Sequence, residues 1–200
     1  LTVLSSVLQL MLIATILDIN GGVALFPMQL LFAKFFVVAT IVVGFIIDVP
    51  DPGVMQRPPR KPGSKIATTA QAWRWVISGL LVAGPALAVL EWGPDEASTE
   101  DPSVSMTMAF GVVAFAAVNI GLVMRRERQP FWTAPVFPYL GWIMLGWGLT
   151  LAAIETRVLQ RLLDTVALTG AQWVLVIALS LVAPAFVAID KAIQLHGQRR

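Results

Sequence analysis

The sequence predicts an all-α integral membrane protein, a bundle of six transmembrane helices. Its 200 residues are 57% hydrophobic and only 13% charged, with a mean hydropathy of +0.78. About a quarter of the residues of a water-soluble domain are charged, so composition excludes that class. Six apolar segments, each close to the length that crosses a bilayer as a helix, follow one another. We expect one transmembrane domain over residues 1–200, with spans at about 1–19, 28–47, 73–90, 104–124, 136–155 and 171–190.

Charges between the segments predict the topology. Of the fourteen lysines and arginines, eleven fall in one set of alternating connections, two fall in the other set, and Lys34 lies inside a span. The connection after the third span is purely acidic. This alternation follows the positive-inside rule. We therefore expect a multi-pass protein of the plasma (inner) membrane with both termini in the cytoplasm.

The second segment, 28–47, is the element around which the chain is organised. Its twenty residues hold no proline and no charge except Lys34, and twenty apolar residues are long enough to cross the hydrocarbon layer. A basic, proline-rich connection over 48–72 follows, and proline cannot continue a helix there. The second span therefore carries a buried cation and ends in a basic loop.

The later segments carry signs of their boundaries and packing. Tryptophans open or close several spans, as amphipathic rings do at the headgroup level. Small residues allow close helix approach, so we expect packing roles for Gly79, Gly84, Gly141, Gly146 and Gly148. Between spans five and six, residues 156–169 mix charges with apolar side chains. That pattern favours an amphipathic segment lying along the outer surface.

Composition and motifs also argue against several functions. The chain has no cysteine and one histidine, which excludes thiol chemistry and a zinc site of cysteines. We expect no metal, no cofactor and no catalytic residue. The bases sit in short loops next to spans, where topology and anionic lipid explain them, so nucleic-acid binding is not expected. The predicted partners are the lipid bilayer and other membrane-protein subunits.

Three strings resemble the carboxy-terminal membrane region of cation-transporting P-type ATPases. They are Pro27-x-Gln29-Leu30-Leu31, then Asp51-Pro52-x-Val54-Met55-x-Arg57-Pro58-Pro59-Arg60, and finally Thr107-Met108-Ala109-Phe110 leading to Arg125-x-Glu127-Arg128. The second string is the strongest, through Val54, Met55, Arg57, Pro58, Pro59 and Arg60. The resemblance covers nearly the whole chain and implies the fifth to tenth membrane helices of that family, the C-terminal half of its membrane domain.

In that family, carboxylate and amide oxygens bind the transported cation near the middle of the bilayer. The resemblance places Lys34, Val37 and Val38 where the family has Asn, Thr and Asp, and Gln9 where it has a glutamate. The expected polar position of the fourth span falls at Ala117, with Asn119 close by. These six residues are therefore degenerate positions of an ion site, because a hard cation needs six or more oxygen ligands.

A lysine at this place needs an explanation, since a cation at a helix centre is unfavourable by about 3 kcal/mol. Lys34 could extend its amine to the outer interface. It could pair with Gln9, Asp18 or a carboxylate of another subunit. It could also be a built-in counter-ion in a proton pathway.

The functional hypothesis is a non-catalytic module derived from the ATPase transport region, acting as a subunit or accessory scaffold of a larger membrane complex. The phosphorylation, nucleotide-binding and actuator motifs of P-type ATPases are absent from the 200 residues, so this chain alone is not expected to hydrolyse ATP. One alternative is the C-terminal transport region of a complete ATPase, since the chain begins with Leu1. Another is a small proton-coupled transporter.

Overall fold

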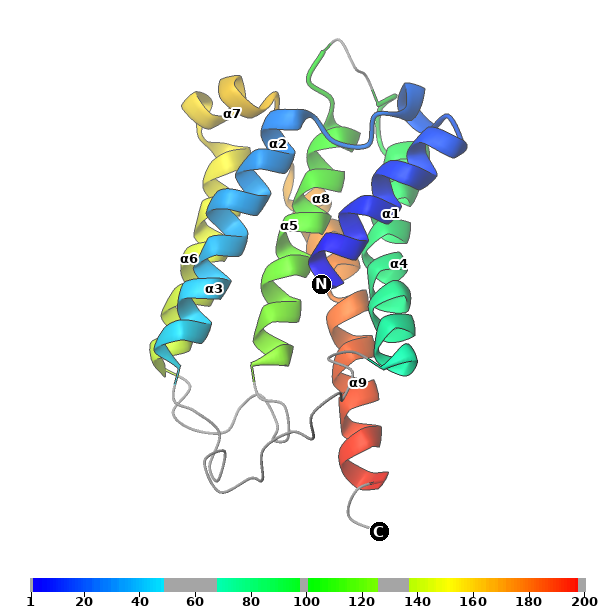
Figure 1. Cartoon of the computed structure of the whole chain (residues 1–200). Helices are drawn as coiled ribbons and strands as arrows, with labels where there is room; N and C mark the ends of the chain where they lie inside the picture. The colour runs from blue at the N-terminus through cyan, green and yellow to red at the C-terminus, as the bar shows by residue number, and fades with distance from the viewer. Residues whose placement is uncertain (1, 49–67, 98–100, 126–136, 198–200) are drawn as a thin grey trace.

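The computed structural model describes residues 2–48, 68–97, 101–125 and 137–197. All regular structure in these ranges is helical (Figure 1), which confirms the predicted all-α class. In chain order the elements are α1 (Thr2–Ile16), η1 (Ile19–Gly22), α2 (Pro27–Phe32), η2 (Ala33–Val37), α3 (Val38–Ile47), α4 (Thr69–Trp92), α5 (Val104–Met124), α6 (Phe137–Glu155), α7 (Arg157–Leu163), α8 (Gly170–Ser180) and α9 (Val182–Gly197).

Four helical stretches are long and apolar enough to cross a membrane, and they match the second, third, fourth and sixth predicted spans. They are Pro27–Ile47, Thr69–Trp92, Val104–Met124 and Gly170–Gln194. The fifth predicted span corresponds to α6, which joins α7 at an 82° bend. The first corresponds to α1, an apolar helix of 15 residues. The amphipathic segment predicted after the fifth span is thus a short helix that turns sharply away from α6.

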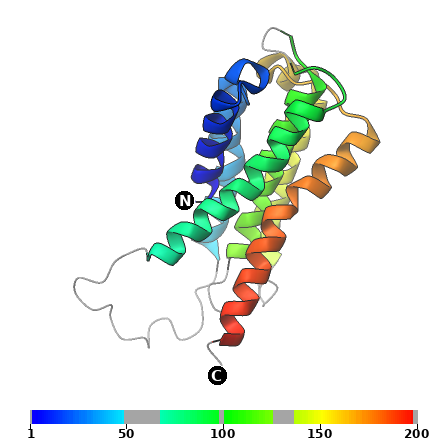
Figure 2. The ribbon, with the colours of Figure 1, turned by 90° about the vertical axis from the view of Figure 1, so that its right-hand side faces the viewer.

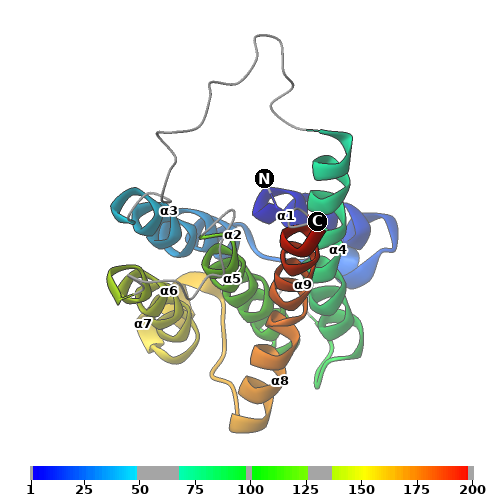
Figure 3. The same ribbon diagram turned by 90° about the horizontal axis from the view of Figure 1, so that it is seen from below.

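Helix α5 is the centre of the bundle. Seen from below, it lies between α3 and α6 on one side and α1, α4 and α9 on the other (Figure 3). Of its membrane-length window, 94% is buried inside the protein. This agrees with its sequence, which is apolar on every face, as expected of a helix surrounded by others.

The two ends of the bundle differ in charge. At one end lie η1, α7 and the connection around Asp95 and Asp101 (Figure 1), and we call this the acidic end. At the other end lie the start of α4 and the ends of α3 and α5 (Figure 1), and we call this the basic end. Arg74 lies near the start of α4, Arg125 follows α5, and Lys191 of α9 donates to the Val123 carbonyl near the end of α5.

Not all glycines named from the sequence are packing residues. A Cβ at Gly79 would lie 2.7 Å from Gln9 Oε1, and one at Gly146 would lie 2.8 Å from Thr40 Oγ1, so both allow close approach as predicted. For Gly84, Gly141 and Gly148, no atom lies within 4 Å of the added Cβ among the described residues. Within this chain the packing prediction is therefore wrong for these three.

Candidate functional site

Lys34 lies in an irregular turn of the second span. Residues Ala33–Val37 form a π-helical turn between α2 and α3, which together make one continuous stretch. Such turns are rare and occur frequently at functional sites. The side chain of Val37, in the same turn, is completely buried. Lys34 and Val37, two of the three ion-site positions predicted on this span, thus lie in its one break in regular α-helix, and Val38 follows it as the first residue of α3.

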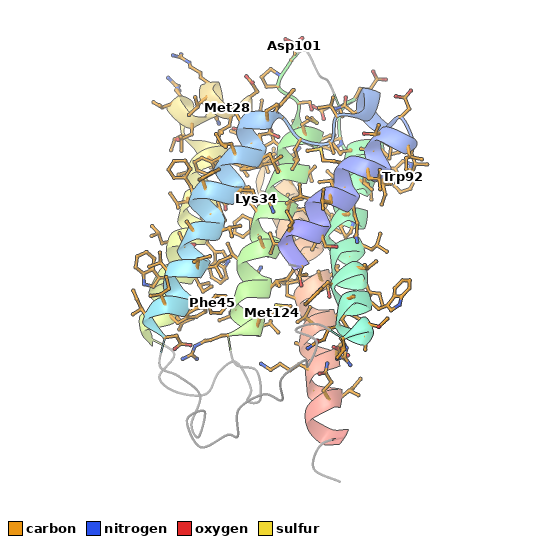
Figure 4. All side chains as sticks on the ribbon, viewed as in Figure 1. Met28, Lys34, Phe45, Trp92, Asp101 and Met124 are labelled. Atoms are coloured by element: carbon orange, nitrogen blue, oxygen red, sulfur yellow. The ribbon has the colours of Figure 1, made fainter. Side chains whose placement is uncertain are left out.

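The amine of Lys34 is held by the backbone of α1. Its Nζ donates a hydrogen bond of 2.9 Å to the carbonyl oxygen of Val3, in the first turn of α1. That turn lies near mid-height in the bundle, away from the acidic end (Figures 1 and 4). Neither Gln9 nor Asp18, the two partners suggested by the sequence, forms this bond. The ammonium is therefore directed into the bundle and bound by a neutral acceptor.

Beside this contact lies a small apolar hollow between α1, α3 and α5. Its volume is about 200 Å³, and its lining includes Val3, Val38 and Ala117. Phe45 and Met124, labelled in Figure 4, line it toward the basic end. The structure thus brings Val38 and Ala117 together at the hollow and joins Lys34 to Val3, another residue of its lining, whereas Val37 is not part of the lining.

The hollow lacks the chemistry of a cation site. None of its lining residues has a carboxylate or an amide side chain, and Thr2 supplies the one side-chain hydroxyl. Within the described ranges, no group of three or more His, Cys, Asp or Glu residues could hold a metal ion. A hard cation requires several oxygen ligands, and the side chains that line this hollow are mostly aliphatic.

The other two predicted positions lie elsewhere. Gln9 faces α4, where its Nε2 donates to the carbonyl of Val76 at 3.2 Å. Its Oε1 is buried without a hydrogen-bond partner among the described residues. Asn119 is two residues beyond Ala117 on α5, and two residues rotate a helix by about 200°. It therefore lies on the opposite face of α5 from the hollow, with 8% of its surface exposed.

A buried ion pair at the basic end was missed by the sequence interpretation. Arg125 Nε and Nη2 donate to Asp48 Oδ2 and Oδ1 at 2.7 and 2.8 Å, and the Arg125 side chain is 0% exposed. The guanidinium also lies 5.5 Å from the ring centre of Tyr139, whose hydroxyl donates to the Gly121 carbonyl. The pair joins α3 to α5 next to the residues that line the hollow. Opposite charges at the same predicted end of two spans are the signal in the sequence, but the predicted fourth span ends at residue 124 and leaves Arg125 in the connection that follows.

At the acidic end, polar residues of the resemblance strings have structural roles. Gln29 is fully buried, and its Nε2 donates to the carbonyl of Leu163 at 3.0 Å. Thr107, also fully buried, accepts a hydrogen bond from the backbone N–H of Val166. Through these hydrogen bonds, Gln29 connects α2 to the end of α7, and Thr107 connects α5 to the segment that follows α7. The strongest resemblance string lies outside the described residues; it contains Val54, Met55, Arg57, Pro58, Pro59 and Arg60.

These observations define an integral membrane protein, an all-helical bundle with a lysine in a π-helical turn of its second span. The family model described as "Cation transporting ATPase, C-terminus" matches residues 22–193. The chain therefore belongs to the family of C-terminal membrane regions of cation-transporting ATPases. No curated protein matches it.

Proposed function

We propose that this chain is a non-catalytic membrane module that acts as a subunit or scaffold of a larger membrane complex. In it, the Lys34 ammonium stands where relatives bind a transported cation. The observation that carries the proposal is the 2.9 Å hydrogen bond from Lys34 Nζ to the Val3 carbonyl, next to a hollow lined by Val38 and Ala117. A fixed ammonium repels a mobile cation, and the hollow gives that cation no acidic ligand.

Cation binding to the purified protein tests the first half of the proposal. The unfolding temperature in detergent is measured with Na⁺, K⁺, Mg²⁺ and Ca²⁺ at constant ionic strength, because a ligand that binds only the folded state raises it. We expect no cation-specific increase for the wild-type chain or for Lys34→Met. A saturable increase with one cation, abolished by substitutions around the hollow, would contradict the proposal.

Isolation of the protein under mild conditions tests the second half. Extraction from native membranes in a gentle detergent should yield a complex with another protein in fixed stoichiometry. A monodisperse monomer after cross-linking in intact membranes would exclude the scaffold role.

The membrane orientation is part of the same proposal. The distribution of the bases supports a cytoplasmic basic end in the plasma (inner) membrane, with both termini on that side. Because the chain has no cysteine, single cysteines at exposed Gln71 and Asp101 would be clean labels. An impermeant thiol reagent added outside should label Asp101→Cys and not Gln71→Cys.

A second candidate is the membrane region of a complete ATPase, and the family description itself favours it, since it refers to a C-terminus. The intact mass of the native protein separates the two candidates. A mass far above 21.6 kDa, with a phosphorylated aspartate upstream, would establish the longer protein. Even then, the residues at the hollow predict an unusual ion or none.

A further inference from the structure

A second pocket lies at the basic end, between α4, α5 and α9. Toward this end α4 and α9 diverge (Figure 2). The pocket has a volume of about 360 Å³ and is lined by residues of all three helices. Arg74, Asp190 and Lys191 are its charged lining residues, so the lining carries one net positive charge. Trp75, on its wall, belongs to the tryptophans that mark the predicted membrane interface. We call it the basic-end pocket.

Arg74 is oriented in this pocket by a carboxylate. Its Nε lies 3.2 Å from Asp190 Oδ2, and the same oxygen accepts a 2.6 Å hydrogen bond from Gln194 Nε2. Across the part of the chain that the structure describes, neither Nη group of Arg74 forms a hydrogen bond. The side chain is 41% exposed. The Nε edge of the guanidinium thus faces a carboxylate, while the two Nη groups remain available to a ligand.

This arrangement suits a phosphate. Two parallel N–H groups of an arginine match two oxygens of a phosphate, which gives a strong and directional interaction. Lys191, from the opposite wall, adds a second positive charge, and its Nζ donates to the Val123 carbonyl at 3.1 Å.

The surroundings favour a phosphate that carries acyl chains. The pocket lining also includes the apolar side chains of Val123, Met124 and Val187, and Met124 is 41% exposed. An exposed apolar side chain in the wall of a cationic site at the end of the spans is suited to lipid tails. We propose that the basic-end pocket binds the headgroup phosphate of an anionic glycerophospholipid, with the Arg74 guanidinium as its main ligand.

The test is the stabilisation of the delipidated full chain by added lipid. The unfolding temperature in detergent is followed while phosphatidylglycerol or phosphatidylcholine is titrated in mixed micelles. We expect stabilisation by phosphatidylglycerol at lower concentration than by phosphatidylcholine. In Arg74→Gln the half-saturating concentration should rise about tenfold, as expected for the loss of one charge-assisted bidentate contact.

Matched variants separate binding from charge and folding. Arg161→Gln makes the same charge change on exposed α7 at the acidic end and should bind lipid like the wild type. Arg74→Lys keeps the charge but lacks the two-pronged donor, so it should bind with intermediate strength. The double variant Arg74→Gln/Asp190→Asn removes the unpaired carboxylate as well and should still bind weakly. Wild-type affinity in Arg74→Gln would overturn the proposal.

A separate experiment distinguishes a soluble phosphate from a lipid headgroup as the ligand of the pocket. Inorganic phosphate and glycerol 3-phosphate are added to the lipid-free protein at millimolar concentration. We expect no stabilisation by either. Stabilisation equal to that by phosphatidylglycerol, lost in Arg74→Gln, would assign the pocket to a soluble phosphate and overturn its assignment to lipid.

Discussion

Lys34, which is half-buried, and Arg125, which is buried, are two cations in one bundle, and their partners differ. Arg125 meets the carboxylate of Asp48 through two hydrogen bonds and is fully enclosed. Lys34 meets the neutral carbonyl oxygen of Val3. The first cation is neutralised where it lies, so it can fasten α3 to α5. The second has no ion pair among the described residues, and its partner Val3 lines the apolar hollow. The two cations of this bundle therefore differ in whether an opposite charge meets them, and we expect their replacement to have different effects on stability.

The largest loss of stability is expected when a buried carboxylate loses the guanidinium that pairs with it. Arg125→Met removes the guanidinium from the Asp48 carboxylate, whose side chain is only 9% exposed. Breaking a buried pair by removing one partner destabilises a protein by about 3–5 kcal/mol. Denaturant titration in detergent micelles measures the loss in free energy of unfolding.

The double variant is the control for this prediction. Asp48→Asn/Arg125→Met removes both charges and should recover most of the loss, because an apolar replacement of a whole pair is often nearly neutral. If the double variant is no more stable than Arg125→Met, the pair is not the reason for the loss.

The packing around the two cations is expected to matter next. A Cβ at Gly121 would lie 2.4 Å from Ile41 Cγ2 on α3, close to both the hollow and the Asp48–Arg125 pair. Overpacking of this kind destabilises by about 1–3 kcal/mol. Gly121→Ala should therefore lower the unfolding temperature, while Gly148→Ala, where the added Cβ meets open space, should not. Equal stability of both variants would mean that α3 and α5 are not in close contact.

Sequence reasoning found the spans better than the contacts between them. Composition and segment length located the helices because hydrocarbon imposes a length on every span. The partner of Lys34 could not be found in that way, since it is a backbone carbonyl, and every residue has one. Asn119 was grouped with Ala117 by proximity in sequence, whereas helix rotation places it on the other face of α5. Gln29 and Thr107 were noted only as parts of the resemblance strings. Their structural roles could not be predicted, because the sequence does not show where α7 packs.

Replacing Lys34 should change the free energy of unfolding in the opposite direction from replacing Arg125. A lysine at a helix centre is unfavourable by roughly 2.5–3.5 kcal/mol, whereas its hydrogen bond to the Val3 carbonyl contributes about 1.5–3 kcal/mol. Lys34→Met should therefore raise the free energy of unfolding by about 1 kcal/mol or leave it unchanged. A loss of several kcal/mol, measured as for Arg125→Met, would show that Lys34 is paired with a carboxylate after all.

The smallest effect is expected for a charged group outside the membrane. Asp95 at the acidic end accepts hydrogen bonds from the backbone N–H groups of Val104 and Ser105, both at 2.7 Å, and from the Ser105 hydroxyl. Partial burial alone would raise the pKa of Asp95, but these hydrogen bonds, that from the Ser105 hydroxyl first, outweigh it and hold the pKa below its usual value. A carboxylate at the start of a helix typically contributes about 1 kcal/mol.

The pH dependence of that contribution has a definite sign. Because the folded pKa is the lower one, the stabilisation is fully present above the unfolded pKa and is lost as the pH falls through the folded pKa. Asp95→Asn should therefore be less stable than the wild type at neutral pH by about 1 kcal/mol, with the gap closing in acid. Unfolding curves of both proteins between neutral and acidic pH test this prediction. If the difference in free energy of unfolding stays constant with pH, the effect comes from the packing of the new amide and not from the carboxylate charge. Unlike Arg125, this residue is exposed, so protonation leaves no buried charge behind and the bundle should remain folded.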